Sequence, residues 1–299
     1  TQGENGIYYH NSSLTNGAGD NSYRYAGASD QVNNYVCFGS STTPCPADNL
    51  YRIIGVFGDK VKLIHAYGAT TDMLGTDEGY AKTYQEAWGS LSSYGSLSSY
   101  YKGNGDLTKI GTYKWNKTRD NTWSTSTTNT INLNTNYLTY LDSKNTKWKT
   151  MIADTTWYVG GMTGENGALS NAKTAYTYEV GANKDATTTV TSKIGLMYVS
   201  DYYYGAVLDY WILPGWTTSA YDYRKAYNDN WMCIGLRDPT ISRNTFGSDG
   251  LYAVDVDGHI GWFDVDGGGF VLRPTFNLVS SIKYIGGSGT SENPIRISL

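Results

Sequence analysis

A short stretch near the C-terminal end, Tyr252 to Val265, constrains the fold most strongly. Two runs of β-branched and aromatic residues flank the pair Asp257-Gly258, and this pattern is the strongest short-range signal for a β-hairpin. The apolar run Phe270 to Leu278 follows and predicts one more strand. The end of the chain is therefore expected to consist of antiparallel strands.

A second hairpin is predicted in the N-terminal half, where Leu50–Phe57 and Lys60–His65 flank the turn pair Gly58-Asp59. Arg52 lies inside the first of these runs, and we expect its charged end to reach solvent or to pair with a carboxylate. Residues 1–34 are rich in Gly, Asn and Ser and predict an extended lead-in.

Helices are expected to be few and short. Helical spacing or weak helical composition marks Tyr84–Trp88, Leu133–Leu141 and the segment around Trp148. Further strands are predicted at Thr155–Gly161, Ala175–Val180, Ile194–Tyr202 and Ile282–Ile285. Because no linker with a shift in composition divides the chain, residues 1–299 are predicted to form one α+β domain, antiparallel and β-rich, with long decorated loops.

The composition favours a secreted or surface-displayed protein over a cytosolic enzyme. Charged residues make up 17% of the chain, against roughly 25% in an average soluble protein. The chain has 28 Tyr and 6 Phe, so most of its aromatic rings carry a polar end. The net charge of −4 and the absence of a basic block argue against nucleic acid as a partner. Since no run of 18 apolar residues occurs, no membrane-spanning helix is expected.

Cysteine usage suits an oxidising compartment. Cys37 and Cys45 enclose a short loop and predict a local disulfide. Two reduced, buried thiols are the alternative. Cys233 lies far from both and is expected to be a free core thiol.

Several phrases resemble a family of surface proteins from Firmicutes and Mollicutes-type bacteria. The phrases lie at 20–27, 34–39, 49–57, 194–202, 240–243, 272–278 and 286–290. In that family the ectodomain often follows a pilin-like N-terminal helix, so the resemblance implies extracellular display and assembly of subunits into a filament. Residues 162–193 match nothing in the family, and the filament-forming helix is not among these 299 residues.

The second half of that family in turn resembles the C-type lectin-like fold, which formylglycine-generating enzymes also use. The block Gly269 to Arg273 is similar to the strand that closes this fold. The resemblance implies that 194–299 forms a lectin-like closing part, and that it displays a variable aromatic surface just before the closing strand, at about 201–248.

Four acidic residues around the C-terminal hairpin raise the question of calcium: Asp255, Asp257, Asp264 and Asp266. Calcium needs six to eight oxygen ligands around one point. The repeated Asp-Val-Asp-Gly is shorter than a full calcium loop and lacks a closing Glu. A hairpin turn with solvated carboxylates is therefore the preferred interpretation, and a calcium site that uses Asp264 and Asp266 is the alternative. No other cofactor is expected.

No catalytic signature is present. The three His residues, at 10, 65 and 259, lie in no recognisable motif, and no Gly-x-Ser-x-Gly elbow occurs. Cys233 has the apolar neighbours Trp231, Met232 and Ile234, which suit a buried thiol better than a nucleophile. Formylglycine-generating enzymes use two cysteines late in the chain, and only Cys233 lies there in this sequence. We therefore expect a protein that is not an enzyme.

The aromatic segment before the hairpin is the remaining candidate for contact with a ligand. Tyr and Trp provide large, stiff contact area with a hydrogen-bonding end, which suits recognition of protein or sugar. Trp211 and Trp231 are expected in the core. The residues predicted to be exposed for binding are Tyr202, Tyr203, Tyr204, Trp216, Tyr221, Tyr223 and Tyr227.

Two functions follow as expectations. The first is a secreted, non-enzymatic bacterial surface protein that is a pilin-like or fibre-forming subunit and associates with itself. The second is a monomeric adhesin or lectin that binds a glycan or a host protein through the aromatic 201–248 surface. A formylglycine-type enzyme is the third and least favoured reading.

Overall fold

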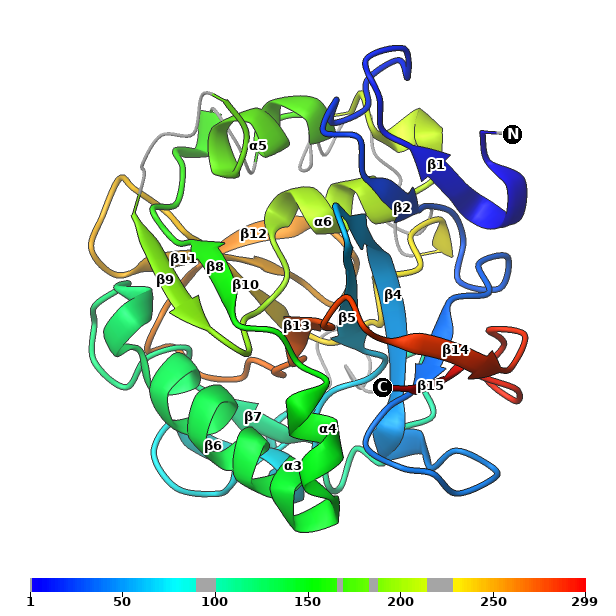
Figure 1. Cartoon of the computed structure of the whole chain (residues 1–299). Helices are drawn as coiled ribbons and strands as arrows, with labels where there is room; N and C mark the ends of the chain where they lie inside the picture. Colours follow the sequence, from blue (N-terminus) through cyan, green and yellow to red (C-terminus); the bar gives the residue numbers. More distant parts are fainter. Residues whose placement is uncertain (1, 90–100, 166–168, 183–187, 214–227) are drawn as a thin grey trace.

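The computed structural model describes residues 2–89, 101–165, 169–182, 188–213 and 228–299. These parts form a strand-rich mixture of several small antiparallel sheets and short helices (Figure 1). The predicted α+β class is therefore confirmed at this level. No helix among the described residues has the length and apolar character needed to span a lipid bilayer.

The largest sheet has six strands and receives its last one from the far end of the chain. Its order is β1-β2-β4-β5-β13, and β3 also pairs with β4. The members are β1 Ile7–Tyr9, β2 Tyr23–Tyr25, β3 Tyr35–Cys37, β4 Leu50–Phe57, β5 Lys60–His65 and β13 Thr275–Asn277. All of these pairings are antiparallel.

The described residues also form four smaller sheets. One has three strands in the order β10-β11-β12, and the others are strand pairs. The strands are β10 Asp238–Arg243, β11 Gly250–Val254, β12 Ile260–Asp264, β6 Tyr80–Thr83 with β7 Gly111–Tyr113, β8 Thr155–Tyr158 with β9 Thr189–Ser192, and β14 Lys283–Gly286 with β15 Arg296–Ser298.

The helices are short, as expected. They are α1 Thr71–Leu74, α2 Tyr84–Trp88, α3 Leu138–Lys144, α4 Thr146–Thr150, α5 Ala172–Glu179 and α6 Val199–Gly205, with a π-helical stretch Thr128–Tyr137 ahead of α3 and single 3-10 turns at Glu4–Gly6, Ala47–Asn49, Trp123–Thr125 and Leu208–Tyr210. The predicted helix over Leu133–Leu141 is thus confirmed, and Trp148 lies in α4. The weak helical patch at Tyr84–Trp88 is α2, and Thr83 and Glu86 cap its N-terminus reciprocally.

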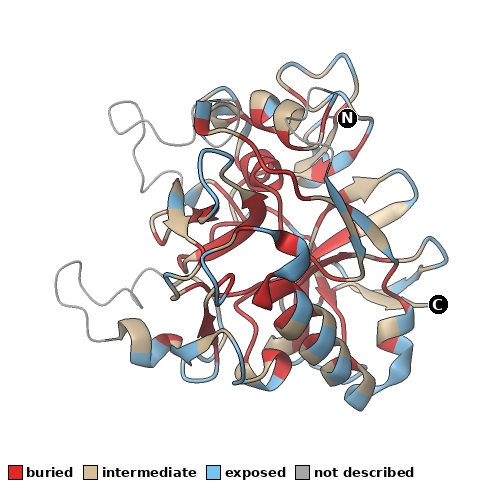
Figure 2. Cartoon of the chain, turned by 90° about the vertical axis from the view of Figure 1, so that its left-hand side faces the viewer, coloured by how far each residue is buried: buried red, intermediate tan, exposed pale blue. Residues whose placement is uncertain are grey.

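The central strands consist largely of buried residues, drawn red in Figure 2. In β5, Leu63 packs into a core cluster with the π-helical stretch, α3 and α4, while Ile64 packs into a second cluster with α5 and α6. Side chains alternate along a strand in the same way in β11, where Leu251 belongs to the first cluster and Tyr252 to the second. Helices therefore cover the two faces of shared strands.

Both predicted hairpins are confirmed. Phe57 pairs with Lys60 across Gly58-Asp59, and Gly58 takes a positive φ of 62°, which two-residue hairpin turns require and glycine adopts without strain. In the C-terminal hairpin Val254 pairs with Ile260. Its turn is wider than the two residues that Asp257-Gly258 predicts, because Gly258 N–H already closes a turn on the carbonyl of Asp255.

Two predicted strands are wrong. Ile194–Tyr202 makes only an isolated bridge at Gly195, and helix α6 begins within it at Val199. Ala175–Val180 lies largely in helix α5, which Asn171 caps by accepting from Thr174 N–H. Helix α6 is buried along its whole length, so its run lacks the one-sided pattern that separates helix from strand. Helix α5 buries one face, but that face consists of Ala172, Ala175 and Glu179, which give little hydrophobic signal.

The closing segment is less regular than predicted. Within Phe270–Leu278 only Thr275–Asn277 forms a strand, which pairs with β5; Phe270 and Leu278 make single bridges to other segments. The predicted strand Ile282–Ile285 is confirmed as β14, and Thr155–Gly161 holds β8. The C-type lectin-like assignment stays a prediction.

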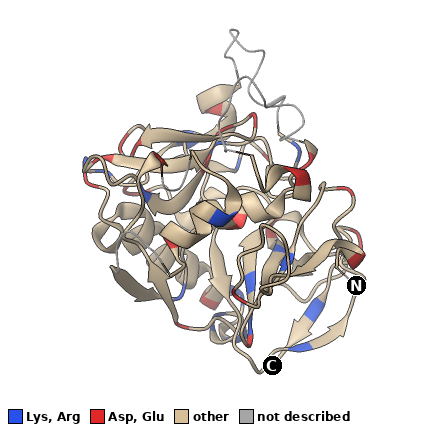
Figure 3. Ribbon diagram, turned by 90° about the horizontal axis from the view of Figure 1, so that it is seen from above, with Lys and Arg blue, Asp and Glu red and all other residues tan. Residues whose placement is uncertain are grey.

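Charged groups lie scattered over the described chain rather than gathered on one face (Figure 3). Several are inside. Arg52, expected to reach solvent or a carboxylate, is buried and donates to Asn34 Oδ1 at 2.6 Å and to the carbonyl of Val32 at 2.8 Å. A chain with few charges thus places some of them where they hold loops together.

Candidate functional site

A pocket with aromatic walls lies between the N-terminal half of the large sheet, the β8 strand and helices α5 and α6. Its volume is about 270 Å³, near the lower end of the roughly 300–1,000 Å³ typical of small-ligand sites. We call it the aromatic pocket. It is lined by Asp20, Arg24, Phe57, Lys62, Thr155, Thr156, Trp157, Tyr158, Tyr176, Val180, Tyr198, Ser200, Asp201 and Asn277.

An ion pair between β5 and α6 forms part of the floor. Lys62 Nζ lies 2.5 Å from Asp201 Oδ2, and the two side chains are 6% and 3% exposed. Lys62 alternates with Val61 and Leu63 along β5, so it points to the face opposite theirs. Asp201 Oδ2 also accepts from Tyr198 N–H at 2.9 Å. The Asp201 carboxylate therefore caps the N-terminus of helix α6 and links the helix to strand β5 through its ion pair with Lys62.

Arg24 of β2 adds a second cation. Its Nη2 donates to Asp20 Oδ2 at 2.6 Å, and its Nη1 lies 3.8 Å from Asp201 Oδ1. The guanidinium sits over the rings of Phe57, at 4.7 Å, and Tyr176, at 5.3 Å. We call Asp20, Arg24, Lys62 and Asp201 the ion network.

Burial and pairing compete in setting the pKa values of the network. Burial lowers the pKa of Lys62, and the charge of Asp201 opposes that shift. Burial raises the pKa of Asp20, but Arg24 and the hydrogen bonds from Ser22 outweigh it, so the pKa stays below its ordinary value. The network is thus held together by pairing rather than by contact with water.

A second buried carboxylate also caps helix α6. Glu179, at the end of α5, accepts the N–H groups of Val199 and Ser200 at 2.9 Å each, and the hydroxyl of Ser242. Burial raises the pKa of Glu179 and these hydrogen bonds oppose the shift. Because both capping carboxylates are fixed, the start of α6 presents Asp201 to the pocket in a set position.

The predicted exposure of Tyr202, Tyr203 and Tyr204 is wrong. The three side chains are 3%, 8% and 1% exposed, because helix α6 is enclosed on every side. Tyr202 donates its hydroxyl to the carbonyl of Gly258, and Tyr204 donates to that of Asn16. These residues pack α6 into the molecule and are not a contact surface.

The other aromatic candidates have mixed outcomes. Trp211 and Trp231 are buried, as predicted. Trp216, Tyr221, Tyr223 and Tyr227 lie outside the described residues. The candidate contact surface at 201–248 is therefore only partly described, and its described α6 portion is core.

The four acidic residues of the hairpin do not meet around one point. Each has a basic neighbour: Arg237 Nε lies 3.1 Å from Asp255 Oδ1, His259 Nδ1 lies 2.5 Å from Asp257 Oδ1, and Arg119 lies 4.0 Å from Asp264 and from Asp266. Within the described ranges no cluster of three or more His, Cys, Asp or Glu could hold a metal ion. The hairpin carboxylates are ion-pair partners.

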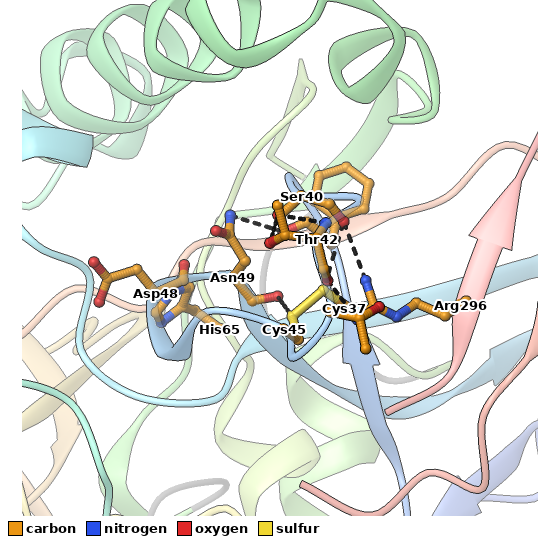
Figure 4. The surroundings of a disulfide bond; sticks show 10 residues. Cys37, Ser40, Thr42, Cys45, Asp48, Asn49, His65 and Arg296 are labelled. Carbon is orange, nitrogen blue, oxygen red and sulfur yellow. Dashed lines mark hydrogen bonds between the residues drawn. A yellow bond between two sulfur atoms is a disulfide. The ribbon is translucent and has the colours of Figure 1, made fainter. Parts of the chain in front are cut away.

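The disulfide prediction is confirmed: Cys37 and Cys45 are bonded (Figure 4). Cys233 is the free, buried thiol that was expected, and burial raises its pKa. A buried thiol with a raised pKa is a poor nucleophile at neutral pH.

Comparison with protein families, with curated proteins and with solved structures finds no match for this chain. The ion network must therefore be interpreted from its own geometry. Sequence reasoning did not identify Arg24, Lys62 or Asp201. A usable signal was present, since Arg24 and Lys62 interrupt β-rich runs in a chain that has few charges.

Proposed function

We propose that the chain is a non-enzymatic recognition protein of the bacterial cell surface that binds a small polar ligand in the aromatic pocket. The observation that carries the proposal is the ion network itself, a set of four charged groups beneath partly exposed rings. Natural pockets for small ligands combine apolar walls with a few fixed polar groups in this way. Ligand binding agrees with the adhesin hypothesis, but the proposed site is the pocket beside α6 rather than an exposed aromatic surface at 201–248.

The extracellular assignment has two supports. A disulfide closes the loop after β3, and such bonds persist mainly in oxidising compartments. Low charge with abundant Tyr, Thr and Asn fits a displayed surface.

The experiment is a binding screen on glycan and protein arrays with two matched variants. Thr156→Trp places a bulky ring at an exposed position of the pocket rim. Thr139→Trp places the same ring on the exposed face of α3, away from the pocket. We expect saturable binding that Thr156→Trp abolishes and Thr139→Trp preserves. Binding that survives Thr156→Trp but is lost in Tyr221→Ala with Tyr223→Ala would move the site to the aromatic loops.

A fibre-forming subunit is the second candidate, and strand β14 favours it. Tyr284 and Ile285 are 66% and 63% exposed on this strand, which in the described chain pairs with β15 alone. An exposed apolar strand edge is a template for pairing with another chain. If the chain assembles through β14, negative-stain microscopy will show filaments that Ile285→Lys disperses; filaments unchanged by Ile285→Lys would exclude this strand.

A further inference from the structure

The polar atoms of the ion network have unused hydrogen-bonding capacity. Lys62 Nζ donates one hydrogen bond, to Asp201 Oδ2, although an ammonium has three N–H donors. Arg24 uses Nε and Nη2, while its Nη1 makes only the 3.8 Å contact with Asp201 Oδ1. Among the described residues Asp201 Oδ1 accepts no hydrogen bond, although the side chain is 3% exposed. Arg24 Nη1 and Asp201 Oδ1 are not among the fully buried polar atoms that lack a partner, so solvent reaches them in the pocket, and together with Lys62 Nζ they can bind a ligand in place of water.

The charge balance restricts what that partner can be. Arg24 and Lys62 contribute two positive charges, and Asp20 and Asp201 two negative charges, so the network sums to zero. An anionic ligand would approach Arg24 together with two carboxylates, and a cationic ligand would meet Lys62 and Arg24. A neutral ligand avoids both repulsions.

The spare atoms also alternate in type. The acceptor Asp201 Oδ1 is the carboxylate oxygen beside Arg24 Nη1, and Lys62 Nζ binds the other oxygen of the same carboxylate. A hydroxyl donates and accepts at a single oxygen. Neighbouring hydroxyls can therefore donate to Asp201 while accepting from Arg24 or Lys62, whereas an amide separates its donor from its acceptor.

The walls supply the remaining contact. Tyr158, Tyr176 and Phe57 are partly exposed rings that line the pocket. Aromatic rings with a wet end offer an apolar face to C–H groups and a hydroxyl to polar ones. The volume of about 270 Å³ suits one small unit rather than an extended chain.

We infer that the aromatic pocket binds an uncharged sugar unit, held by its vicinal hydroxyls on Asp201, Arg24 and Lys62. The inference rests on the proposed recognition function and assigns its ligand class. The site needs no metal, because a carboxylate and two cations already supply the acceptor and the donors.

The test is a titration of the full chain with four kinds of probe, in which saturation-transfer NMR detects binding. The probes are methyl glycosides of neutral pyranoses, glucuronate, glucosamine and N-acetylglycine amide. We expect transfer to a neutral glycoside alone, lost in Thr156→Trp and retained in Thr139→Trp. Asp201→Asn replaces one carboxylate oxygen, which accepts hydrogen bonds, by an amide NH2 group, which donates them. We expect this variant to bind the neutral glycoside at least about tenfold more weakly.

The two proposals fail separately. Transfer to glucuronate, glucosamine or the amide that Thr156→Trp abolishes would overturn the sugar assignment and leave the recognition function standing. Absence of transfer from all four probes in the folded wild-type chain would overturn both. Since Asp201 also caps α6, an Asp201→Asn variant that does not fold is replaced by Lys62→Gln, which keeps donors without the charge and should weaken glycoside binding by a similar factor.

Discussion

At the scale of single residues, the pairing of Lys62 with Asp201 should matter far more than a surface ion pair. Lys62→Met leaves the Asp201 carboxylate buried with the N–H of Tyr198 as its hydrogen-bond donor and only the 3.8 Å contact to Arg24 as a charged partner. Removing one partner of a buried pair costs about 3–5 kcal/mol in free energy of unfolding, because the other charge is left uncompensated. Urea denaturation of wild type and variant measures this loss.

Two further variants complete that test. Lys149→Met breaks a pair with Asp142 whose side chains are 38% and 33% exposed, and such pairs contribute about 0–1 kcal/mol. Adding Asp201→Asn to Lys62→Met should cost less than the sum of the single changes, since both act on one interaction. Equal losses for Lys62→Met and Lys149→Met would show that the network is not desolvated.

His10 should make the protein sensitive to mild acid. Burial, and then the charge of Arg24, lower the pKa of His10 to about 3, against the opposing charge of Asp20. Its Nδ1 accepts the N–H of Ala18 at 3.1 Å and the ring packs on Tyr204. Below the ordinary His pKa, His10 binds a proton in the unfolded chain but stays neutral in the folded chain. The free energy of unfolding therefore falls as the pH drops from about 6.5 toward 3. The loss at pH 5 is about 2 kcal/mol.

The measurement is urea denaturation across pH 4–8 for wild type and His10→Asn, whose amide oxygen can replace Nδ1 as the acceptor. The acid slope should shrink but persist in part, since burial also lowers the pKa of His65. His259→Asn is the control. Asp257 raises the pKa of His259 against burial, so His259 contributes stability below its unfolded pKa and loses it as pH rises. An undiminished acid slope in His10→Asn would contradict the assignment.

At the scale of elements, the disulfide should hold the C-terminal strand in place. Arg296 of β15 donates to the carbonyl of Thr42, at 2.7 Å, inside the loop that Cys37 and Cys45 close (Figure 4). Replacing both cysteines by Ser should lower the free energy of unfolding by about 2–3 kcal/mol for so short a loop. We also expect faster hydrogen exchange at Ile295, whose N–H donates to Tyr35 O, than at β10. Uniform acceleration across the chain would exclude a local role.

The elements also show what sequence patterns can predict. The hairpins at Gly58-Asp59 and Asp257-Gly258 were predictable because a turn and its flanking strands are local signals. Helix α6 was not, because it is buried on every side and shows no one-sided periodicity, and helix α5 was not, because its buried face holds only two Ala residues and a Glu. Only a cap such as Asn171 indicated a helix start. Arg24 and Lys62 could have been singled out as charges within β-rich runs, but their meeting with Asp201 could not be predicted, because tertiary packing alone brings the three together.

At the scale of the whole molecule, the shared strands should make unfolding cooperative. In β11, Leu251 and Ala253 pack into the first core cluster and Tyr252 and Val254 into the second. Neither cluster can lose its packing while the strand between them stays in place, so both should report one transition. Leu251→Ala should lower the free energy of unfolding by about 2–5 kcal/mol, and the loss should be the same for amides of both clusters.

Native-state hydrogen exchange tests this with one amide on each side, Leu63 in β5 for the first cluster and Tyr202 in α6 for the second. Ile285→Ala, at an exposed position of β14, serves as the control and should change neither amide. Selective loss of protection at Leu63 would mean that the clusters unfold separately and that the chain contains two units. Equal loss would support a single domain, because the strand that separates the clusters also couples them.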